Sequence, residues 1–350
     1  GLFYAVYGYL IFQNLTLIDT PFFMALLHAF VLSVILLRER PTLDRRTWGL
    51  AILSGAIFGL ALLTRPILPF LAVLLPVWFL FRLNLRQTLA RLAPVALVGA
   101  AVLLPWIARN YQVYDTFVPM SLTAGANLYQ GNNPDVLPYM RAGYDPQWTG
   151  PDALTADPDS PEGDRERVAL ALAFLRENPK LIPDLLWTKF ATHWSIDVFP
   201  RRNPVEGRLP RLDYQGNAIE ETDDAGNVEL GGLPPGDPVA TYSDPLFDQI
   251  GRAAHRVYFG ALFALALVGV VASARQWREV SLLWFVQISM TVVYVVFHPS
   301  TRYRVPTDPM LFLFSAYALV WLWAWWLKRA AMPAAEARAQ QAVAPKPPLR

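Results

Sequence analysis

A short polar segment between two apolar runs holds the side chains best suited to bind an anion. The segment runs from His298 to Pro309 with the sequence HPSTRYRVPTDP, and it places Tyr303 between Arg302 and Arg304. A guanidinium group keeps its charge at physiological pH and forms paired hydrogen bonds with phosphate oxygens. The prolines of the segment prevent either flanking helix from continuing through it. We therefore expect a stiff, cationic turn that binds phosphate, in which His298 either contacts the same phosphate or caps the preceding helix.

A second candidate cation is Arg65, the only charged residue in the sequence LLTRPILPF between two other apolar runs. Two interpretations are open for it. The side chain extends to lipid headgroups, or it contacts a phosphate group of a bound ligand.

The stretch that follows the fifth apolar run is rich in amides and aromatic rings. Such side chains form hydrogen bonds with sugar hydroxyls and stack on sugar faces, so the stretch is a candidate site for a sugar or an acceptor. Its candidate residues are Arg109, Asn127, Tyr129, Gln130 and Asn132. The Gly-Asn-Asn-Pro sequence within it is equally typical of an ordinary turn.

Other kinds of chemistry find little support in the sequence. His193 and Asp197 have the spacing of one helix face, but no third ligand lies nearby, which favours a structural pair over a metal site. The chain has no cysteine, no phosphate-binding glycine loop, no Ser/His/Asp set and no zinc signature. We predict no cofactor and no nucleic-acid binding. Binding of a divalent metal stays open, because acidic residues are plentiful but form no set with convincing ligand spacing.

The elements that position these residues are predicted to be membrane-spanning helices. Of the 350 residues, 54% are hydrophobic, and they gather in runs of the length that crosses a bilayer. The sequence predicts an all-α polytopic membrane protein with about eight spans and a large mixed insert outside the membrane. The predicted spans are residues 2–18, 21–37, 47–64, 66–82, 89–107, 257–274, 280–297 and 309–327.

Charge predicts the organisation of the chain across the membrane. We expect five spans in residues 1–107, a loop domain in 108–254, three spans in 255–328 and a disordered cytoplasmic tail in 329–350. The loop domain contains 22 acidic and 12 basic residues, whereas short basic segments join the spans elsewhere. By the positive-inside rule, the insert lies outside a bacterial-type inner membrane. Arg65, Arg302 and Arg304 then lie on the outer side, where that rule does not explain them.

Three features are expected within the loop domain. Residues 167–179 have helical periodicity and stop at Asn-Pro. The aromatic stretch 185–199 is predicted to form an interfacial helix on the membrane surface. The acidic, turn-rich segment from residue 212 to 238 is interpreted as a solvated excursion without chemistry, with a small hairpin around residues 224–227.

Four segments, taken in order, resemble the membrane-embedded glycosyltransferases of the GT-C class. They are GLALLTRP, PWIARNYQVYDTFVPMS with GANLYQGNNP, RVALALAFLRENP and HPSTRYRVPTDPMLFLF. The likeness is nearest to family 39, which includes protein mannosyltransferases and bacterial aminoarabinose transferases. It implies transfer of a sugar, with inversion, from a polyprenyl-phosphate donor to a lipid, glycan or protein acceptor on the outer face. Residues implied in binding the lipid phosphate are Arg65, Arg302, Arg304 and His298; those implied for the sugar or acceptor are Asn127, Tyr129, Gln130 and Asn132.

The resemblance also implies a general base, a carboxylate that follows the first span of the family. The chain begins within an apolar run and without an initiator Met, so we expect this aspartate upstream of Gly1 in an N-terminally truncated protein. Asp19 lies on the correct side but matches a later loop of the family. Two alternatives are an O-antigen ligase or polymerase that uses lipid-diphosphate donors, and a transporter. The transporter is disfavoured because the middles of the spans are nearly free of charge.

Overall fold

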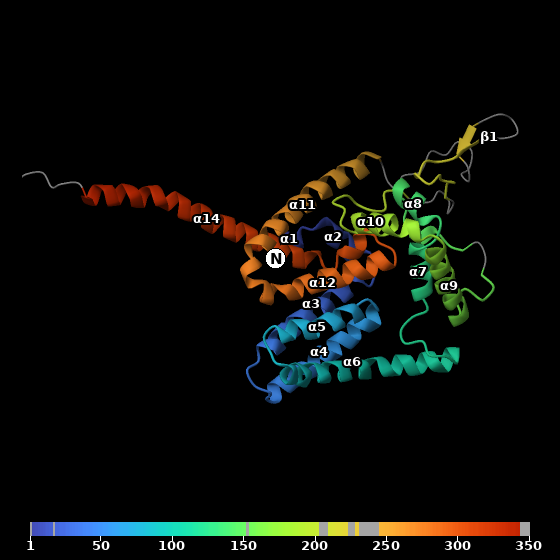
Figure 1. Ribbon diagram of the computed structural model, residues 1–350, viewed down its shortest axis with the longest axis horizontal. Helices are drawn as coiled ribbons and strands as arrows, with labels where there is room; N and C mark the ends of the chain where they lie inside the picture. The colour runs from blue at the N-terminus through green and yellow to red at the C-terminus, as the bar shows by residue number, and fades with distance from the viewer. Residues whose placement is uncertain are drawn as a thin grey trace, which may run out of the picture.

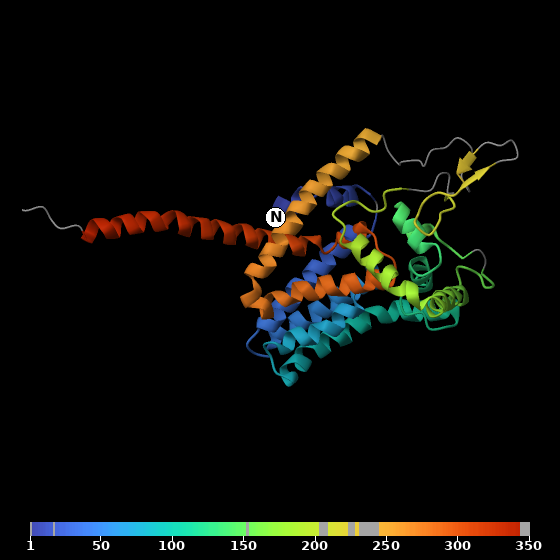
Figure 2. The same cartoon turned by 45° about the horizontal axis from the view of Figure 1, so that its top comes forward.

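The computed structural model describes residues 2–16, 18–151, 154–202, 209–222, 228–230 and 245–343. It divides into a bundle of long helices and a group of shorter helices at one end of that bundle (Figures 1 and 2). The shorter helices belong to the insert, and the bundle is formed by the segments before and after it.

Among the described residues, six helices are long and apolar enough to cross a membrane, as expected for an integral, all-α membrane protein. Three precede the insert: α3 (Thr20–Glu39), α4 (Arg45–Thr64) and α6 (Leu85–Tyr114). Three follow it: residues Gln249–Ala272 of α11 (Pro245–Ala272), residues Ala274–Val296, which comprise η3 (Ala274–Gln276) and α12 (Trp277–Val296), and residues Asp308–Arg329 of α14 (Asp308–Val343). The predicted count of eight is therefore not confirmed over these residues.

The two remaining apolar runs form shorter helices. Residues 2–18 divide into α1 (Leu2–Ala5) and α2 (Gly8–Leu15). Residues 66–82 yield α5 (Pro69–Leu80), which has 12 residues and is thus about 18 Å long. That is shorter than the hydrocarbon core of a bilayer, about 30 Å. The hydropathy of the run did not reveal that the helix begins only at Pro69.

Small residues bring α4 and α6 close together. A Cβ atom added to Gly55 would lie 2.7 Å from the carbonyl oxygen of Val95, and one added to Gly59 would lie 2.7 Å from Cβ of Val102. Such small residues, four apart, allow helices to approach within a membrane. α3, α5 and α12 pack on this pair around one buried apolar cluster.

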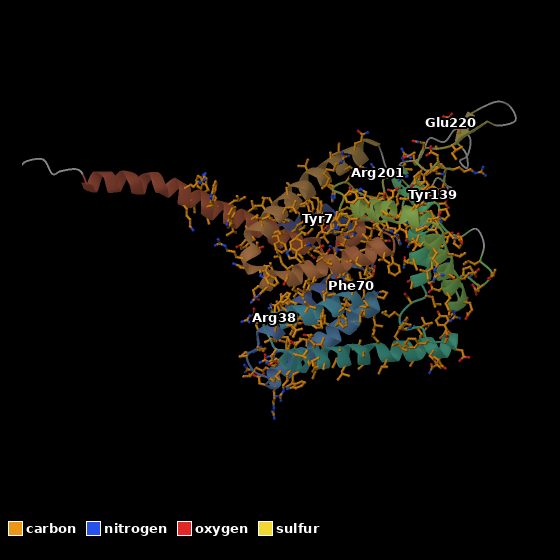
Figure 3. The ribbon with its side chains drawn as sticks, in the orientation of Figure 1. Tyr7, Arg38, Phe70, Tyr139, Arg201 and Glu220 are labelled. Carbon is orange, nitrogen blue, oxygen red and sulfur yellow. The ribbon has the colours of Figure 1, made fainter. Side chains whose placement is uncertain are left out.

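The second half of the bundle joins α2, α11 and α14. Ser315 on α14 donates a hydrogen bond to the carbonyl oxygen of Leu262 on α11, at 2.7 Å. The Tyr7 hydroxyl, just before α2, donates to the Asp308 carboxylate at 2.7 Å. At the end of the bundle away from the insert, buried Arg38 pairs with Glu279 at 3.0 Å (Figure 3). This end contains the basic segment 38–46.

Within its described residues, the insert contains four α-helices. They are α7 (Ala124–Gly131), α8 (Val136–Ala142), α9 (Pro161–Glu177) and α10 (Ile182–His193), with short 3-10 turns η1 (Pro146–Trp148) and η2 (Pro179–Leu181). α8, α9 and α10 contribute to a small apolar core, and α7 packs on α9. The helix predicted at 167–179 is confirmed as α9, which is capped by Ser160 and stops before Asn178-Pro179. α10 starts and ends earlier than the aromatic stretch, and its Trp187 is 67% exposed.

The acidic excursion and the tail are the remaining parts. Strands β1 (Glu220–Thr222) and β2 (Val228–Leu230) pair antiparallel, with Glu220 opposite Leu230. They flank the predicted hairpin turn at 224–227, which lies outside the described residues. The tail predicted as disordered from residue 329 is instead helical to Val343. Its many Ala, Glu, Arg and Gln residues favour a helix, which composition alone did not distinguish from disorder. Residues 344–350 lie outside the described part.

Candidate functional site

A cavity of about 510 Å³ lies where the membrane-spanning helices meet the insert. Its walls come from the α4–α5 turn, the segment 116–123 between α6 and α7, the first turns of α7 and α9, and the end of α12. Most of the lining is apolar. The polar lining residues that matter here are Arg65, Asn127, Tyr294, His298 and Tyr303. The fold thus brings three of the predicted site residues, Arg65, Asn127 and His298, to one cavity.

Arg65 enters the cavity from the C-terminal end of α4, and it is held there by Asp19. Nε of Arg65 donates to one carboxylate oxygen of Asp19 at 2.5 Å, and Nη2 donates to the other at 2.8 Å. Nη2 also contacts the Thr20 hydroxyl at 2.5 Å. These bonds use two of the three guanidinium nitrogens. The guanidinium also interacts with the side chain of Tyr294, another residue of the cavity lining.

Asp19, considered from the sequence as a candidate general base, is the counter-ion of Arg65. Its hydrogen bonds from Arg65 lower the pKa of the carboxyl group below its ordinary value. A lower pKa makes the carboxylate a weaker proton acceptor. The geometry favours a role for Asp19 in orienting Arg65.

His298 and Tyr303 form a polar chain that leads from the cavity to Arg302. Nε2 of His298 lies 3.1 Å from the Tyr303 hydroxyl, which in turn accepts a hydrogen bond from Nη2 of Arg302 at 3.0 Å. Since an arginine can only donate, the proton of this hydroxyl is available to His298. Burial lowers the pKa of His298, so its ring is neutral at pH 7.

Arg302 does not itself line the cavity. Its Nη2 atom donates to the side-chain oxygen of Gln147 at 2.8 Å and lies 3.4 Å from the fully buried carboxylate of Asp145. The side chain is 38% exposed. Arg302 thus joins α13 (Thr301–Arg304) to the insert by polar contacts. Its hydrogen bond to the Tyr303 hydroxyl links it to the cavity lining.

Arg304 faces the interior of the bundle and lies apart from the cavity. Its Nε atom pairs with Asp308 at 2.9 Å, and both side chains are fully buried. Nη1 donates to the carbonyl oxygens of His193 at 2.9 Å and Ser195 at 3.1 Å. The guanidinium also lies 3.9 Å from the ring centre of Phe259. This environment favours a structural role over the expected contact with a lipid phosphate.

The insert holds the end of α12, and with it the start of the His298 segment. Nδ2 of Asn132 donates to the carbonyl oxygen of Val296 at 3.0 Å, and Nζ of Lys189 lies 3.3 Å from the same oxygen. Lys189 also donates to Oδ1 of Asn132 at 2.9 Å. A Cβ atom on Gly131 would overlap the carbonyl group of Phe297. Burial lowers the pKa of Lys189 to about 7, so it is a lysine close to losing its charge.

The remaining predicted sugar-binding residues do not gather at the cavity. Because residues 124–131 form a helix, their side chains point around its axis at about 100° per residue. Asn127 reaches the cavity, while the side chain of Gln130 donates to the carbonyl oxygen of Gln147 at 3.1 Å. Tyr129 is partly buried in α7, outside the cavity lining. Arg109 lies on α6 against Trp106, with its guanidinium 5.2 Å from the ring centre.

His193 and Asp197 do not share a helix face, because α10 ends at His193. The His193 ring is buried and stacks on Tyr294, and Asp197 pairs with Arg256 at 3.3 Å. Over the described ranges, no group of three or more metal-binding side chains is placed to hold a metal ion.

Tyr294, Asp145 and Lys189 are the residues near the site that the sequence did not identify. Tyr294 stacks on Tyr303 with ring centres 4.9 Å apart. A single lysine in an aromatic stretch was the only signal for Lys189.

Comparisons with protein-family models, curated proteins and solved structures find no match for this chain.

Proposed function

We propose that this protein is a membrane-embedded glycosyltransferase of the GT-C type that uses a polyprenyl-phosphate-linked sugar. The observation that carries the proposal is the cavity beside Arg65. Its wall is mainly apolar, it lies at the ends of α4 and α12, and it contains Arg65 together with His298 and Tyr303. A lipid phosphate needs this combination: apolar surface for the chain and fixed donors for the phosphate at the edge of the membrane.

Arg65 would stabilise the leaving group in this reaction. The bond between the anomeric carbon and the phosphate oxygen breaks, its electrons remain on the lipid phosphate, and the acceptor oxygen bonds to the opposite face of that carbon. The acceptor proton passes to a general base. Negative charge thus develops on the phosphate, and a preorganised guanidinium in a site of low polarity lowers the energy of that state. The neutral ring of His298 adds a second polar contact without repelling Arg65.

The charges support an outward orientation of the insert. The bundle end with the basic segment 38–46 would face the cytoplasm, and the acidic insert would face outward. The acceptor would then be a lipid, glycan or protein on the outer face, with membrane lipids around the bundle.

The proposal is tested by the class of donor that the full chain binds. The purified protein is incubated with a polyprenyl-monophosphate sugar or with a polyprenyl-diphosphate sugar, and native mass spectrometry counts the bound lipid. We expect retention of the monophosphate donor, and weaker retention in Arg65→Gln. Preference for the diphosphate donor would instead indicate a ligase or polymerase, and retention of neither would overturn the proposal.

A further inference from the structure

A second cavity, of about 640 Å³, lies in the insert and shares no lining residue with the first. Four of its nine lining residues are arginines, and none of the nine is acidic. The lining is Arg141, Ala142, Arg201, Arg202, Gln215, Gly216, Asn217, Ala218 and Arg252. Arg201 lies in the same part of the insert as Tyr139 of α8 (Figure 3).

The backbone holds these arginines in place from separate segments of the chain. The N–H groups of Arg201 and Arg202 donate to the carbonyl oxygen of Gly143 at 2.8 and 3.0 Å. Nη2 of Arg252, on α11, donates to the carbonyl oxygen of Arg201 at 2.9 Å. Arg141, at the end of α8, thus shares one cavity with a loop and with a membrane-spanning helix.

One wall of the cavity is a turn that requires glycine. Gly216 has a φ of +86°, and a Cβ atom there would lie 2.8 Å from both the nitrogen of Ala142 and the carbonyl oxygen of Pro138. Asp213 organises the turn by accepting hydrogen bonds from the backbone of Gln215 and Asn217, at 2.8 and 2.9 Å. The turn places two amide side chains beside the arginines.

The charge of the cavity is opposite to that of the insert around it. The insert has 22 acidic and 12 basic residues, yet four of those basic residues line this one cavity. One of them, Arg141, pairs with Asp184 at 2.5 Å and donates to the carbonyl oxygen of Tyr214 at 2.6 Å. Several guanidinium groups around one space give it a positive potential, which attracts an anion.

We propose that this cavity binds an anion with two or more phosphate groups. Guanidinium groups pair with phosphate oxygens through two parallel hydrogen bonds, and several around one space favour a multiply charged ligand over a single charge. A neighbouring groove along α10 shares Arg141 and Arg201 and also contains exposed Trp187. The ligand therefore combines its phosphates with an apolar or ring-shaped part, as in a phosphorylated glycan or a lipid headgroup.

The test measures binding of inorganic pyrophosphate to the full chain by isothermal titration calorimetry. Every protein carries Arg65→Gln, which removes from the first cavity the cation proposed to bind the lipid phosphate, so that failure of one proposal does not affect the other. The test variant adds Arg201→Gln and Arg202→Gln, which keep the backbone bonds to Gly143. The control adds Arg176→Gln, an exposed arginine of α9 outside the cavity.

We expect pyrophosphate to bind the reference protein, and the double substitution to weaken its affinity about tenfold or more. The control should leave the affinity within about twofold, because exposed charges far from a ligand are screened. The proposal is overturned if the reference protein gives no heat of binding, or if the control weakens binding as much as the test variant.

A second arm identifies the source of the phosphate. The reference protein is placed in phosphatidylcholine nanodiscs with or without phosphatidylglycerol, and pyrophosphate binding is measured again. Weaker binding with phosphatidylglycerol supports occupation of the cavity by a lipid headgroup. Equal binding in both supports a soluble phosphorylated ligand.

Discussion

Arg302 and Arg304 lie two residues apart on the single turn α13, yet they have opposite environments. Arg302 is partly exposed and contacts Gln147 and Tyr303 in the polar region beside the cavity. Arg304 is fully buried and pairs with Asp308 inside the bundle. Residues two apart on a helix point in nearly opposite directions. One turn therefore connects the bundle interior to the candidate site.

The difference shows that a cationic segment at a membrane boundary contains more than one kind of arginine. Arg304 contacts Asp308, two backbone carbonyl oxygens and an aromatic ring, as a structural ion pair does. Arg302 reaches the cavity only through the Tyr303 hydroxyl. Arg65, from a distant part of the sequence, lines the cavity itself, as does Arg165 of α9.

The largest expected effect is a loss of folding free energy on substitution of Arg304, the buried arginine of the two. Arg304→Met leaves the Asp308 carboxylate buried without its cation, which typically costs about 3–5 kcal/mol of folding free energy. We expect little monodisperse protein in size-exclusion chromatography. Arg304→Met combined with Asp308→Leu should recover part of the yield, because no buried charge remains. Equal yields of Arg304→Met and the unsubstituted protein would contradict a structural role.

Lys189 provides a second buried cation, whose hydrogen bonds go to amide and backbone oxygens. Its pKa falls from 10.5 to about 7 on burial, so between those pH values the unfolded chain binds a proton that the folded chain lacks. Stability should therefore rise with pH across this window, by at most about 1.4 kcal/mol per pH unit. Lys189→Met should remove this contribution in thermal unfolding between pH 7 and 10.5. The exposed Lys180→Met serves as the control, and an unchanged slope in Lys189→Met would rule out this assignment.

Substitution of the partly exposed Arg302 should lower the folding free energy less than substitution of Arg304. Arg302→Gln removes a guanidinium that is 38% exposed and lies 3.4 Å from the buried Asp145 carboxylate, so the loss should stay below the roughly 3–5 kcal/mol of a fully buried pair. We expect the variant to fold with a lower unfolding temperature, and to retain the monophosphate donor more weakly because Tyr303 and His298 lose their anchor. Donor retention is measured by native mass spectrometry. Unchanged retention would show that Arg302 does not contribute to donor binding at the site.

The smallest effect on stability is expected at the rim of the cavity. Asp19→Asn removes a half-exposed counter-ion and leaves Arg65 without a competing carboxylate. If Asp19 only orients Arg65, lipid-phosphate binding should be retained or slightly tightened, as read from the shift in unfolding temperature on adding polyprenyl phosphate. Loss of turnover with retained binding would instead indicate that Asp19 is the general base.

Much of the fold could be predicted, because membrane-spanning helices are encoded by local apolar runs. The six long helices and α9 follow from such runs and from caps such as Ser160. The span predicted at 66–82 is instead the shorter helix α5, because hydropathy does not show where a helix starts. The grouping of Arg65, Asn127 and His298 was expected only in outline, since their distances depend on tertiary packing. For Arg304, the i, i+4 spacing to Asp308 was visible in the sequence, but its contacts with Phe259 and His193 were not.

The most direct test of the account is whether Arg65 binds a lipid phosphate in the cavity. Thermal unfolding of the full chain is measured with and without polyprenyl phosphate, for the unsubstituted protein, Arg65→Gln and the control Arg176→Gln. We predict that the lipid raises the unfolding temperature of the unsubstituted protein and the control, and that Arg65→Gln loses most of this shift. An undiminished shift in Arg65→Gln would contradict the central claim.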